Sequence, residues 1–484
     1  MTSNDSGKSS RALWAMIGCA CLCLLSLWPV SACHREESLV TPPIPPSVAG
    51  QFVALSPDRK YLVNTITNKP VFLTGDSPQL LMVQVSDADV DTYLADRAAR
   101  GFNALWVYPA DAVDQKSAPK NYYGNVPFDG ADFTNEDATY WAHVDSVLQK
   151  AAAYKITLVL DPGYVGLTPP FGYLNSYLNS SDDVMKAYGA WLGNRYKGYN
   201  NVIWSLGGDA DLSIPGLAGK IANLANGLAT ADRNHLITLE ACRFCTPANQ
   251  SSLDAFATTP SWLSLNWVYN PQASVIDGCQ KNFSRSSAAP PLMGEDWYEL
   301  THGMTGVDTR AEGYWEVLSG CYLGTLWGNG PLWSFNSPKS DYASPSWQSQ
   351  LSSVGSVSQE WMGKLMRSRE HWKMAPDINH TVVTAGYGSG MTVTATARTS
   401  DGQTIIAYIP NGSVSTLTVD MTKISSAKQS CTGWWFNPSN GVTTEIGVFA
   451  ASGTHTFTPP DGNDWVLVLD DSSADLKAPG SGDL

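Results

Sequence analysis

The sequence has few charged residues, and few basic ones in particular. Only 15% of its 484 residues are charged, and 30 Lys and Arg stand against 44 Asp and Glu, giving a formal net charge of -14. Nucleic-acid binding depends on neutralising phosphates with basic side chains, so this balance argues against a nucleic-acid partner. Hydrophobic residues make up 43% of the chain, which is enough to bury a large core and argues against extensive disorder.

Several motifs that mark catalytic or cofactor sites are also missing. The sequence has no HExxH zinc motif, no phosphate-binding loop, no GxSxG elbow and no glycine fingerprint after its first predicted strand. Its seven His residues are scattered. Cys242 and Cys245 have CxxC spacing, but a single such pair is weak support for zinc or redox chemistry. We therefore expect no metal ion and no cofactor.

The N-terminus has the pattern of a secretory signal. Lys8 and Arg11 precede an uninterrupted apolar run over 13–30, which is followed by small residues and Cys33. The ending Val-Ser-Ala-Cys resembles a bacterial lipobox, so we expect residues 1–32 to be removed and Cys33 to be lipidated. An uncleaved membrane anchor is the alternative, since the run is just long enough to span a bilayer.

A Pro-rich stretch over 33–50 is predicted to form an extended tether between the lipid and the folded domains. His34 follows the lipidated position, where an aspartate would indicate retention in the inner membrane. We therefore expect an exported protein anchored to a bacterial membrane, with the outer membrane favoured. The oligomeric state is left open.

Five of the nine cysteines remain after the signal and the lipid site: Cys242, Cys245, Cys279, Cys321 and Cys431. Disulfides persist outside the cytoplasm. Because five is odd, at least one thiol stays unpaired, and its burial is expected. The CxxC pair is read as a loop disulfide or as two buried thiols.

Residues 51–370 alternate between short apolar strands and amphipathic helices. The predicted strands cover 71–77, 104–109, 156–163, 201–209, 236–242, 264–270, 291–299 and 324–329. The clearest helices cover 89–102, 140–154 and 183–196, with a further helix near 357–370. Eight strand–helix repeats fit a (β/α)8 TIM barrel better than a doubly wound sheet.

The composition and hydrophobic pattern of the sequence change after that last helix. Residues 371–470 alternate with period two and are rich in Thr, Val, Ser and Gly, with turn signals such as Asn411-Gly412 and Asn440-Gly441. This pattern predicts a small C-terminal antiparallel β-sandwich. Residues 471–484 are predicted to form a disordered tail.

The active site of a TIM barrel lies at the C-terminal ends of its strands. Those ends carry carboxylates and aromatic rings and no His cluster, which points to glycosidic bond cleavage: a pair of carboxyl groups does the chemistry and aromatic rings stack on sugars. Asp209 ends the fourth strand and Glu295 lies in the seventh, so both can face one cleft. The predicted substrate-binding residues are Asp76, Trp106, Asp161, Tyr164, Trp267, Tyr269, Trp297, Trp327 and Asn329.

Each catalytic assignment has competitors. Asp209 could instead cap a following helix, and Asp211 is an alternative acid. Glu295 competes with Asp296, which alternation places on the opposite side of the strand, and with Glu299, which lies past the strand. Asp76 and Asp161 could bind sugar hydroxyls or could only cap helices and hold loops, and many of the tryptophans could be core residues.

Several blocks resemble the apiosidase-like glycoside hydrolases: VFLTGDS, DRAARGFNALWV, HVDSVLQKAAAYKITLVL, YGAWLGNRYKGYNNVIWSLGGD, MGEDWYE and RAEGYWEVLSGCYLGTLWGNGPLW. WWFNPSNG (434–441) resembles a small sandwich, labelled collagen-binding, that often follows these barrels. The resemblance covers about 55–470. It implies a retaining mechanism in which Asp209 is the acid/base and Glu295 the nucleophile. The wider superfamily of retaining barrel glycosidases usually has Asn-Glu where this chain has Gly208-Asp209.

The sequence thus predicts a retaining glycoside hydrolase acting on side chains of plant cell-wall or related polysaccharides. Two other classes stay open. The chain could be a non-catalytic carbohydrate-binding surface lipoprotein that keeps the barrel. It could also act on collagen or peptides, although it lacks a protease metal site or nucleophile.

Overall fold

A computed structural model describes residues 50–111, 119–166, 172–243, 245, 250–285, 289–295, 297–337 and 340–484. The predicted signal, Cys33 and nearly all of the tether lie outside these residues. Within the described part of the chain, every helix is too short or too polar to cross a membrane.

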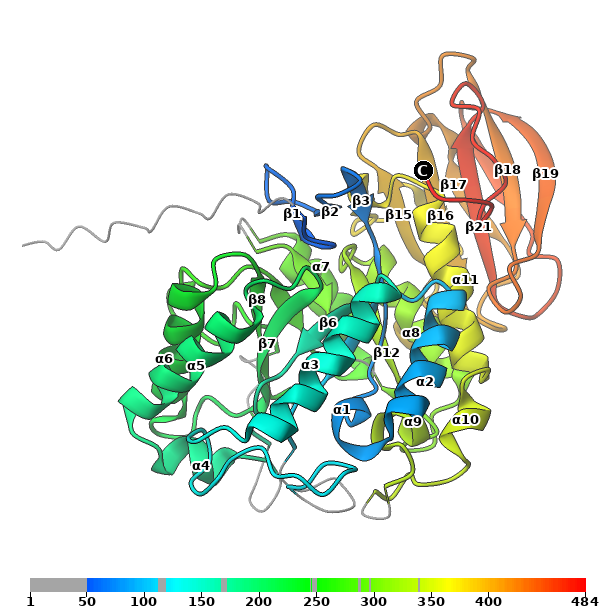
Figure 1. Ribbon diagram of the computed structural model, residues 1–484. Coiled ribbons are helices and arrows are strands. Elements are labelled where there is room, and N and C mark those ends of the chain that lie inside the picture. Colours follow the sequence, from blue (N-terminus) through cyan, green and yellow to red (C-terminus); the bar gives the residue numbers. More distant parts are fainter. Residues whose placement is uncertain are drawn as a thin grey trace, which may run out of the picture. The chain divides into compact units, whose positions relative to one another are not determined.

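Eight parallel strands of the described residues form a nearly closed barrel (Figure 1). Their order is β8 (Leu236–Ala241), β7 (Val202–Ala210), β6 (Thr157–Leu160), β5 (Ala104–Val107), β4 (Leu73–Asp76), β12 (Gly324–Asn329), β10 (Pro291–Met293) and β9 (Asn266–Val268). At the seam between β8 and β9, the Ser264 amide donates to the Ile237 carbonyl at 2.8 Å. Seven of these strands lie within ranges predicted from the sequence, and β7 extends one residue past its predicted range of 201–209, which confirms the TIM barrel.

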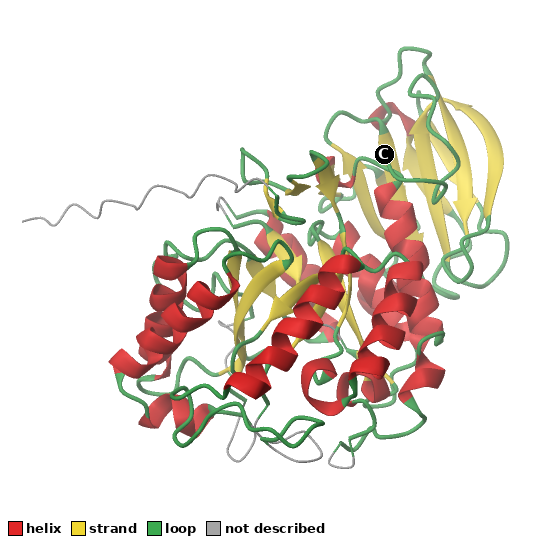
Figure 2. Ribbon diagram, in the orientation of Figure 1, coloured by secondary structure: helices red, strands yellow, loops and turns green. Residues whose placement is uncertain are grey.

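Short helices and helical turns connect and surround these strands (Figure 2). They are α1 (Leu81–Gln84), α2 (Asp87–Ala99), α3 (Ala138–Ala153), α4 (Leu174–Asn179), α5 (Asp182–Tyr196), α6 (Leu217–Ala231), η2 (Gln272–Ser274), α7 (Val275–Phe283), α8 (Gly306–Leu318), α9 (Gly330–Ser334), α10 (Trp347–Gln350) and α11 (Val354–Arg367). A two-residue strand, β11 (Tyr298–Glu299), pairs with the end of β12.

Local sequence explains where the main helices begin. The side chains of Ser86, Asp137 and Ser181 cap α2, α3 and α5 by accepting hydrogen bonds from backbone amides of the first turn. In α3, the apolar residues that recur at helical spacing are all buried: Val144, Leu148 and Ala151. Propensity and burial therefore agree along this helix.

The region after α11 is built from antiparallel strands. One sheet has the order β13 (Met374–Pro376), β15 (Ala395–Thr399), β16 (Thr404–Ile409), β21 (Trp465–Asp471), β18 (Ser430–Phe436) and β19 (Thr443–Ala450). The other has the order β14 (Val383–Ala385), β17 (Leu417–Asp420) and β20 (Thr454–Phe457). A buried cluster that includes Ile405, Leu417 and Leu467 fills the space between them. This confirms the C-terminal β-sandwich. A third small sheet, β1 (Ala54–Leu55), β2 (Leu62–Asn64) and β3 (Lys69–Val71), precedes the barrel.

Helix α8 joins barrel and sandwich through buried contacts. The Arg310 guanidinium donates to both carboxylate oxygens of Asp464, at 2.6 and 2.8 Å. The rings of Tyr314 and Tyr408 stack with centroids 4.6 Å apart. The Trp315 indole N–H donates to the Val393 carbonyl at 2.9 Å.

The final residues, where the sequence predicts a disordered tail, make defined contacts. The Gly480 amide donates to the Ser368 hydroxyl at 2.9 Å, and the Leu484 amide donates to the Arg367 carbonyl at 3.0 Å. The Ser368 side chain and the Arg367 backbone carbonyl, at the end of α11, thus give this segment partners that its polar, Gly-rich composition does not reveal.

The cysteines form two disulfides and one buried thiol. Cys242 pairs with Cys245, and Cys279 with Cys321, while Cys431 is free and buried in the sandwich. The CxxC motif is therefore a loop disulfide, and it directly follows β8.

Candidate active site

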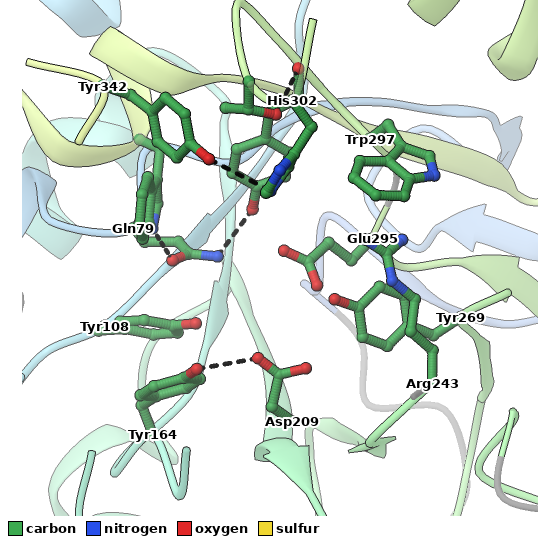
Figure 3. Close-up of a pocket in the computed structure, with 13 residues that line it drawn as sticks. Gln79, Tyr108, Tyr164, Asp209, Arg243, Tyr269, Glu295, Trp297, His302 and Tyr342 are labelled. Carbon is green, nitrogen blue, oxygen red and sulfur yellow. Dashed lines mark hydrogen bonds between the residues drawn. The ribbon is translucent and has the colours of Figure 1, made fainter. Parts of the chain in front are cut away.

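A cavity of about 230 Å³ opens where strands of the barrel end (Figure 3). Its lining residues are Gln79, Tyr108, Tyr164, Asp209, Arg243, Tyr269, Glu295, Trp297, Tyr298, Thr301, His302, Trp333 and Tyr342. Most of them follow the carboxyl end of a barrel strand, which is where this fold places catalytic residues. The two predicted catalytic carboxylates therefore share one pocket.

The LGGD motif positions Asp209 by bending the end of β7. The pairing of β7 with β8 shifts register between Leu206 and Ala210, and φ is positive at Gly207 (102°), Gly208 (65°) and Asp209 (54°). A side chain at Gly208 would collide with the ring of Tyr164. The two glycines thus permit a bulge that turns Asp209 toward the cavity, and its left-handed backbone is of a kind that concentrates at functional sites.

Asp209 is held by a phenol and has a raised proton affinity. Tyr164 donates its hydroxyl to Asp209 Oδ2 at 2.9 Å, and Tyr269 lines the same cavity. Burial and the nearby Glu295 carboxylate raise the pKa of Asp209 to about 7. A carboxyl with this pKa can be protonated near neutral pH and act as a general acid.

Glu295 follows β10 from the other side of the pocket (Figure 3). The residue before it is glycine, and a side chain at Gly294 would collide with the indole of Trp267. Tyr298 lines the cavity together with Glu295, and its hydroxyl accepts a hydrogen bond from Gln79 Nε2 at 2.8 Å. Gln79 in turn accepts a hydrogen bond from the Trp333 indole. This chain of hydrogen bonds holds the Tyr298 hydroxyl in the cavity that Glu295 also faces.

Arg243 supplies positive charge beside the acids. Its guanidinium carbon lies 4.4 Å from the ring centroid of Tyr269 and 4.5 Å from that of Trp297. Burial opposes the charge of Arg243, but Tyr269 and then the carboxylates of Glu295 and Asp209 outweigh this effect and raise the pKa of Arg243. The disulfide between Cys242 and Cys245 brackets Arg243 and fixes the loop that presents it.

A third carboxyl group, Glu240 of β8, completes an acidic cluster. Among the residues that the structure describes, Asp209, Glu240 and Glu295 have carboxylate oxygens within 4.8 Å of one another. Burial, followed by the negative charges of Glu295 and Asp209, raises the pKa of Glu240 well above its usual range. Oxygens this close are compatible with a shared proton or with a bound divalent cation.

The predicted substrate-binding residues divide into two groups. Tyr164, Tyr269 and Trp297 line the cavity. Trp106 and Trp267 do not; they are buried and pack edge-on against each other, with centroids 5.1 Å apart. These two indoles form part of the barrel core, because side chains inside a small barrel fill it completely.

Four other predicted residues hold the structure around the pocket. Asp76 is fully buried and pairs with Arg97 at 3.1 Å. Trp327 donates its indole N–H to Thr309 Oγ1 at 3.3 Å.

Asn329 caps α9 and donates to Glu299 Oε2 at 3.2 Å. Asp161 accepts from the Gly163 amide at 3.1 Å, and its other oxygen lies against the LGGD bulge at Gly208. The ion pair of Asp76 with Arg97 and the hydrogen bonds of Asn329 account for these two buried polar side chains, so a sugar contact is not needed to explain them.

The competing acids also have defined places. Asp211 accepts hydrogen bonds from the amide and hydroxyl of Ser213 in a turn. Glu299 accepts from the Ser353 hydroxyl at 2.6 Å and does not line the cavity. Asp296 lies outside the described residues. Asp209 and Glu295 are thus the pair, among these candidates, that the structure brings to the cavity.

Several residues that line the cavity were not predicted from the sequence. His302 and Tyr342 come from loops, and the Tyr342 hydroxyl lies 3.2 Å from His302 Nε2. No spacing pattern marks such loop residues. Arg243 could have been predicted as a cavity residue, since it directly follows the fifth predicted strand, but its neighbouring cysteines were interpreted only as a disulfide or as buried thiols.

Comparisons with known proteins agree with this architecture. Residues 56–373 match the family model "Apiosidase-like, catalytic domain", and residues 376–470 match "Putative collagen-binding domain of a collagenase". No match was found among curated proteins.

Solved structures share the fold. One described as a glycoside hydrolase has a TM-score of 0.74 and 23% identity, covering 88% of this chain and 99% of its own. A glycoside hydrolase family 5 protein from Bacteroides vulgatus has a TM-score of 0.74 and 22% identity, covering 87% and 93%. At this identity the likeness concerns the fold.

Proposed function

Since the chain belongs to the apiosidase-like family, whose catalytic-domain model covers residues 56–373, we propose that it is a retaining glycoside hydrolase. We propose that it acts on side chains of plant cell-wall or related polysaccharides. The observation that supports this best is the pair of carboxyl groups, Asp209 and Glu295, which face one cavity with oxygens within 4.8 Å. Retaining enzymes place these groups about 5–5.5 Å apart, whereas inverting enzymes separate them by about 6.5–9.5 Å.

In the proposed reaction, the Glu295 carboxylate attacks the anomeric carbon while Asp209 gives its proton to the glycosidic oxygen that leaves. The resulting glycosyl-enzyme ester is cleaved by water, from which Asp209 now removes a proton. The pKa of about 7 suits Asp209 to both steps, because the group can hold and release a proton near neutral pH. Arg243 keeps a positive charge beside both carboxyl groups.

The cavity suits a single sugar unit. Its volume of about 230 Å³ lies below the range of about 300–1,000 Å³ typical of pockets for drug-sized ligands. Tyr108 and Tyr164 stack with centroids 5.1 Å apart on one side, and Trp297 lies on the other. Aromatic faces of this kind pack against the C–H faces of sugars.

The test is incubation with a panel of plant cell-wall oligosaccharides, with NMR following the released sugar and its anomeric configuration. We expect release with retention, and a loss of more than about 10³-fold in kcat for E295Q, which keeps the shape and removes the nucleophile. E299Q is the matched control, because Glu299 lies outside the cavity. Inversion would refute the retaining mechanism, and full activity in E295Q would refute the assignment.

The rival proposal, a carbohydrate-binding lipoprotein without catalysis, predicts sugar binding but no release. Calorimetry with E295Q and the same oligosaccharides should show binding under both proposals. The NMR assay of the wild type separates them, since only our proposal predicts turnover. We also propose that the protein is exported and anchored to a bacterial membrane through lipidated Cys33, which would place the enzyme near extracellular polysaccharide.

A further inference from the structure

Glu240 is a buried acid that the two-carboxylate mechanism does not use. It lies near the end of β8 with an exposed fraction of 0%. Neither carboxyl oxygen accepts a hydrogen bond from an N–H or O–H of the described residues, and none of their Lys or Arg side chains forms an ion pair with it. An isolated carboxylate in such a place would be very costly, so the group needs a proton or a cation.

The groups that face Glu240 are acids and phenols. One of its carboxyl oxygens lies within 4.8 Å of an oxygen of Glu295 and of one of Asp209. The charges of Glu295, Asp209 and Asp161 all act on it. Four tyrosines have a pKa raised by burial and also by the negative charge of Glu240. They lie on four different strands or in the loops after them: Tyr108, Tyr164, Tyr269 and Tyr298. Arg243 acts on Glu295 and Asp209.

Two carboxyl groups this close repel each other unless one of them is protonated, and the proton can then be shared between them. Of this pair, Glu240 is the more deeply buried, and Glu295 is partly exposed in the cavity. Glu295 also shares the cavity with the Tyr298 hydroxyl and with the guanidinium of Arg243. Burial also raises the pKa of Glu240, so the proton is expected on Glu240.

We propose that Glu240 is a neutral positioning residue that donates a hydrogen bond to the carboxylate of Glu295 and holds this nucleophile toward the anomeric carbon. The inference rests on the proposed function. No additional proton is consumed, since Glu240 keeps its proton throughout turnover. The nucleophile then has an O–H donor from β8, and the Tyr298 hydroxyl of β11 lies in the same cavity.

Two substitutions separate hydrogen bonding from packing. E240Q retains an N–H donor and the shape, so kcat/KM should stay within about threefold of the wild type. E240M fills the space without a donor and should lose about 10- to 100-fold in kcat, as expected for a hydrogen bond to a charged group. The acidic limb of the pH–rate profile should move to higher pH in E240M alone, because the charged nucleophile has lost a donor.

A second measurement does not need a substrate. The infrared difference spectrum of wild type minus E240Q at pH 7 should contain the C=O band of a protonated carboxylic acid, shifted in D2O. If the wild type released no sugar while this band was present, the proposed function would fail and the protonation of Glu240 would stand.

Three results would overturn the inference. One is the absence of that band; another is an E240Q variant as inactive as E240M despite a normal melting temperature. The third is loss of activity in EDTA with recovery in Ca²⁺ or Mg²⁺, which would assign Glu240 to a cation site instead.

Discussion

Removal of the Glu295 charge should lower the pKa of Asp209. Burial and the Glu295 carboxylate together raise that pKa to about 7 in the wild type. In E295Q the second cause disappears while the shape of the pocket is kept. Asp209 should therefore lose its proton at a lower pH than in the wild type.

The distance sets the size of the effect. The oxygens lie within 4.8 Å of each other. At that upper limit, the repulsion between two unit charges is about 0.9 kcal/mol at an effective dielectric constant of 80 and about 3.5 kcal/mol at 20. At 1.36 kcal/mol per pH unit, the midpoint of Asp209 should fall by about 0.6 to 2.5, to between about 4.5 and 6.4.

The titration can be followed by NMR of protein labelled with ¹³C at the aspartate carboxyl carbons, with D209N identifying the signal. E360Q is the control, because Glu360 pairs with Arg100 on the outer helices and lies outside the cavity. It should leave the midpoint unchanged. An unchanged or higher midpoint in E295Q would refute the claim that these two groups interact, and with it the assignment of acid and nucleophile.

Three further outcomes follow from the structure. Burial raises the pKa of Asp161 to about 7 in the folded state. As pH rises from about 4 to 7, the unfolded chain loses this proton at a lower pH than the folded protein does, so the carboxyl lowers the free energy of unfolding over that range. D161N should therefore gain up to about 4 kcal/mol in free energy of unfolding at pH 8 and almost nothing at pH 4, as measured in urea; an equal gain at both pH values would contradict this. R310M leaves Asp464 buried without its partner and should cost about 3–5 kcal/mol, whereas R310M combined with D464L should recover most of the loss in the same denaturation assay. In a bacterial host that lipidates exported proteins, C33S should abolish incorporation of labelled palmitate and release the protein from the membrane fraction, and labelled C33S would show that another residue is modified.

The barrel could be predicted because its strands are short, apolar and regularly separated by helical patterns. This periodicity predicts the strand ranges and therefore the carboxyl ends of the strands. Because Asp209 and Glu295 lie at two such ends, their placement at one cavity could be predicted as well. The β7 bulge was less visible, since two consecutive glycines reveal freedom of the backbone but not the direction in which Asp209 turns.

Position at a strand end did not reveal a side chain's partners. Asp76 and Asn329 end their strands as a ligand-binding residue would, yet Arg97 and Glu299 reach them from other elements. Such contacts depend on how helices and loops pack, which a single sequence does not show. Loop residues such as His302 were missed for the same reason.

The burial of α8 limits how this protein can be divided. Arg310, Tyr314 and Trp315 on this helix all contact the sandwich, while the helix also belongs to the barrel. A fragment cut near residue 370 would expose these rings and leave a guanidinium without its counter-ion, so it should aggregate on expression. Gene fusions that exchange the C-terminal module would have to carry a matching helix surface, and the two modules are expected to be inherited as one unit.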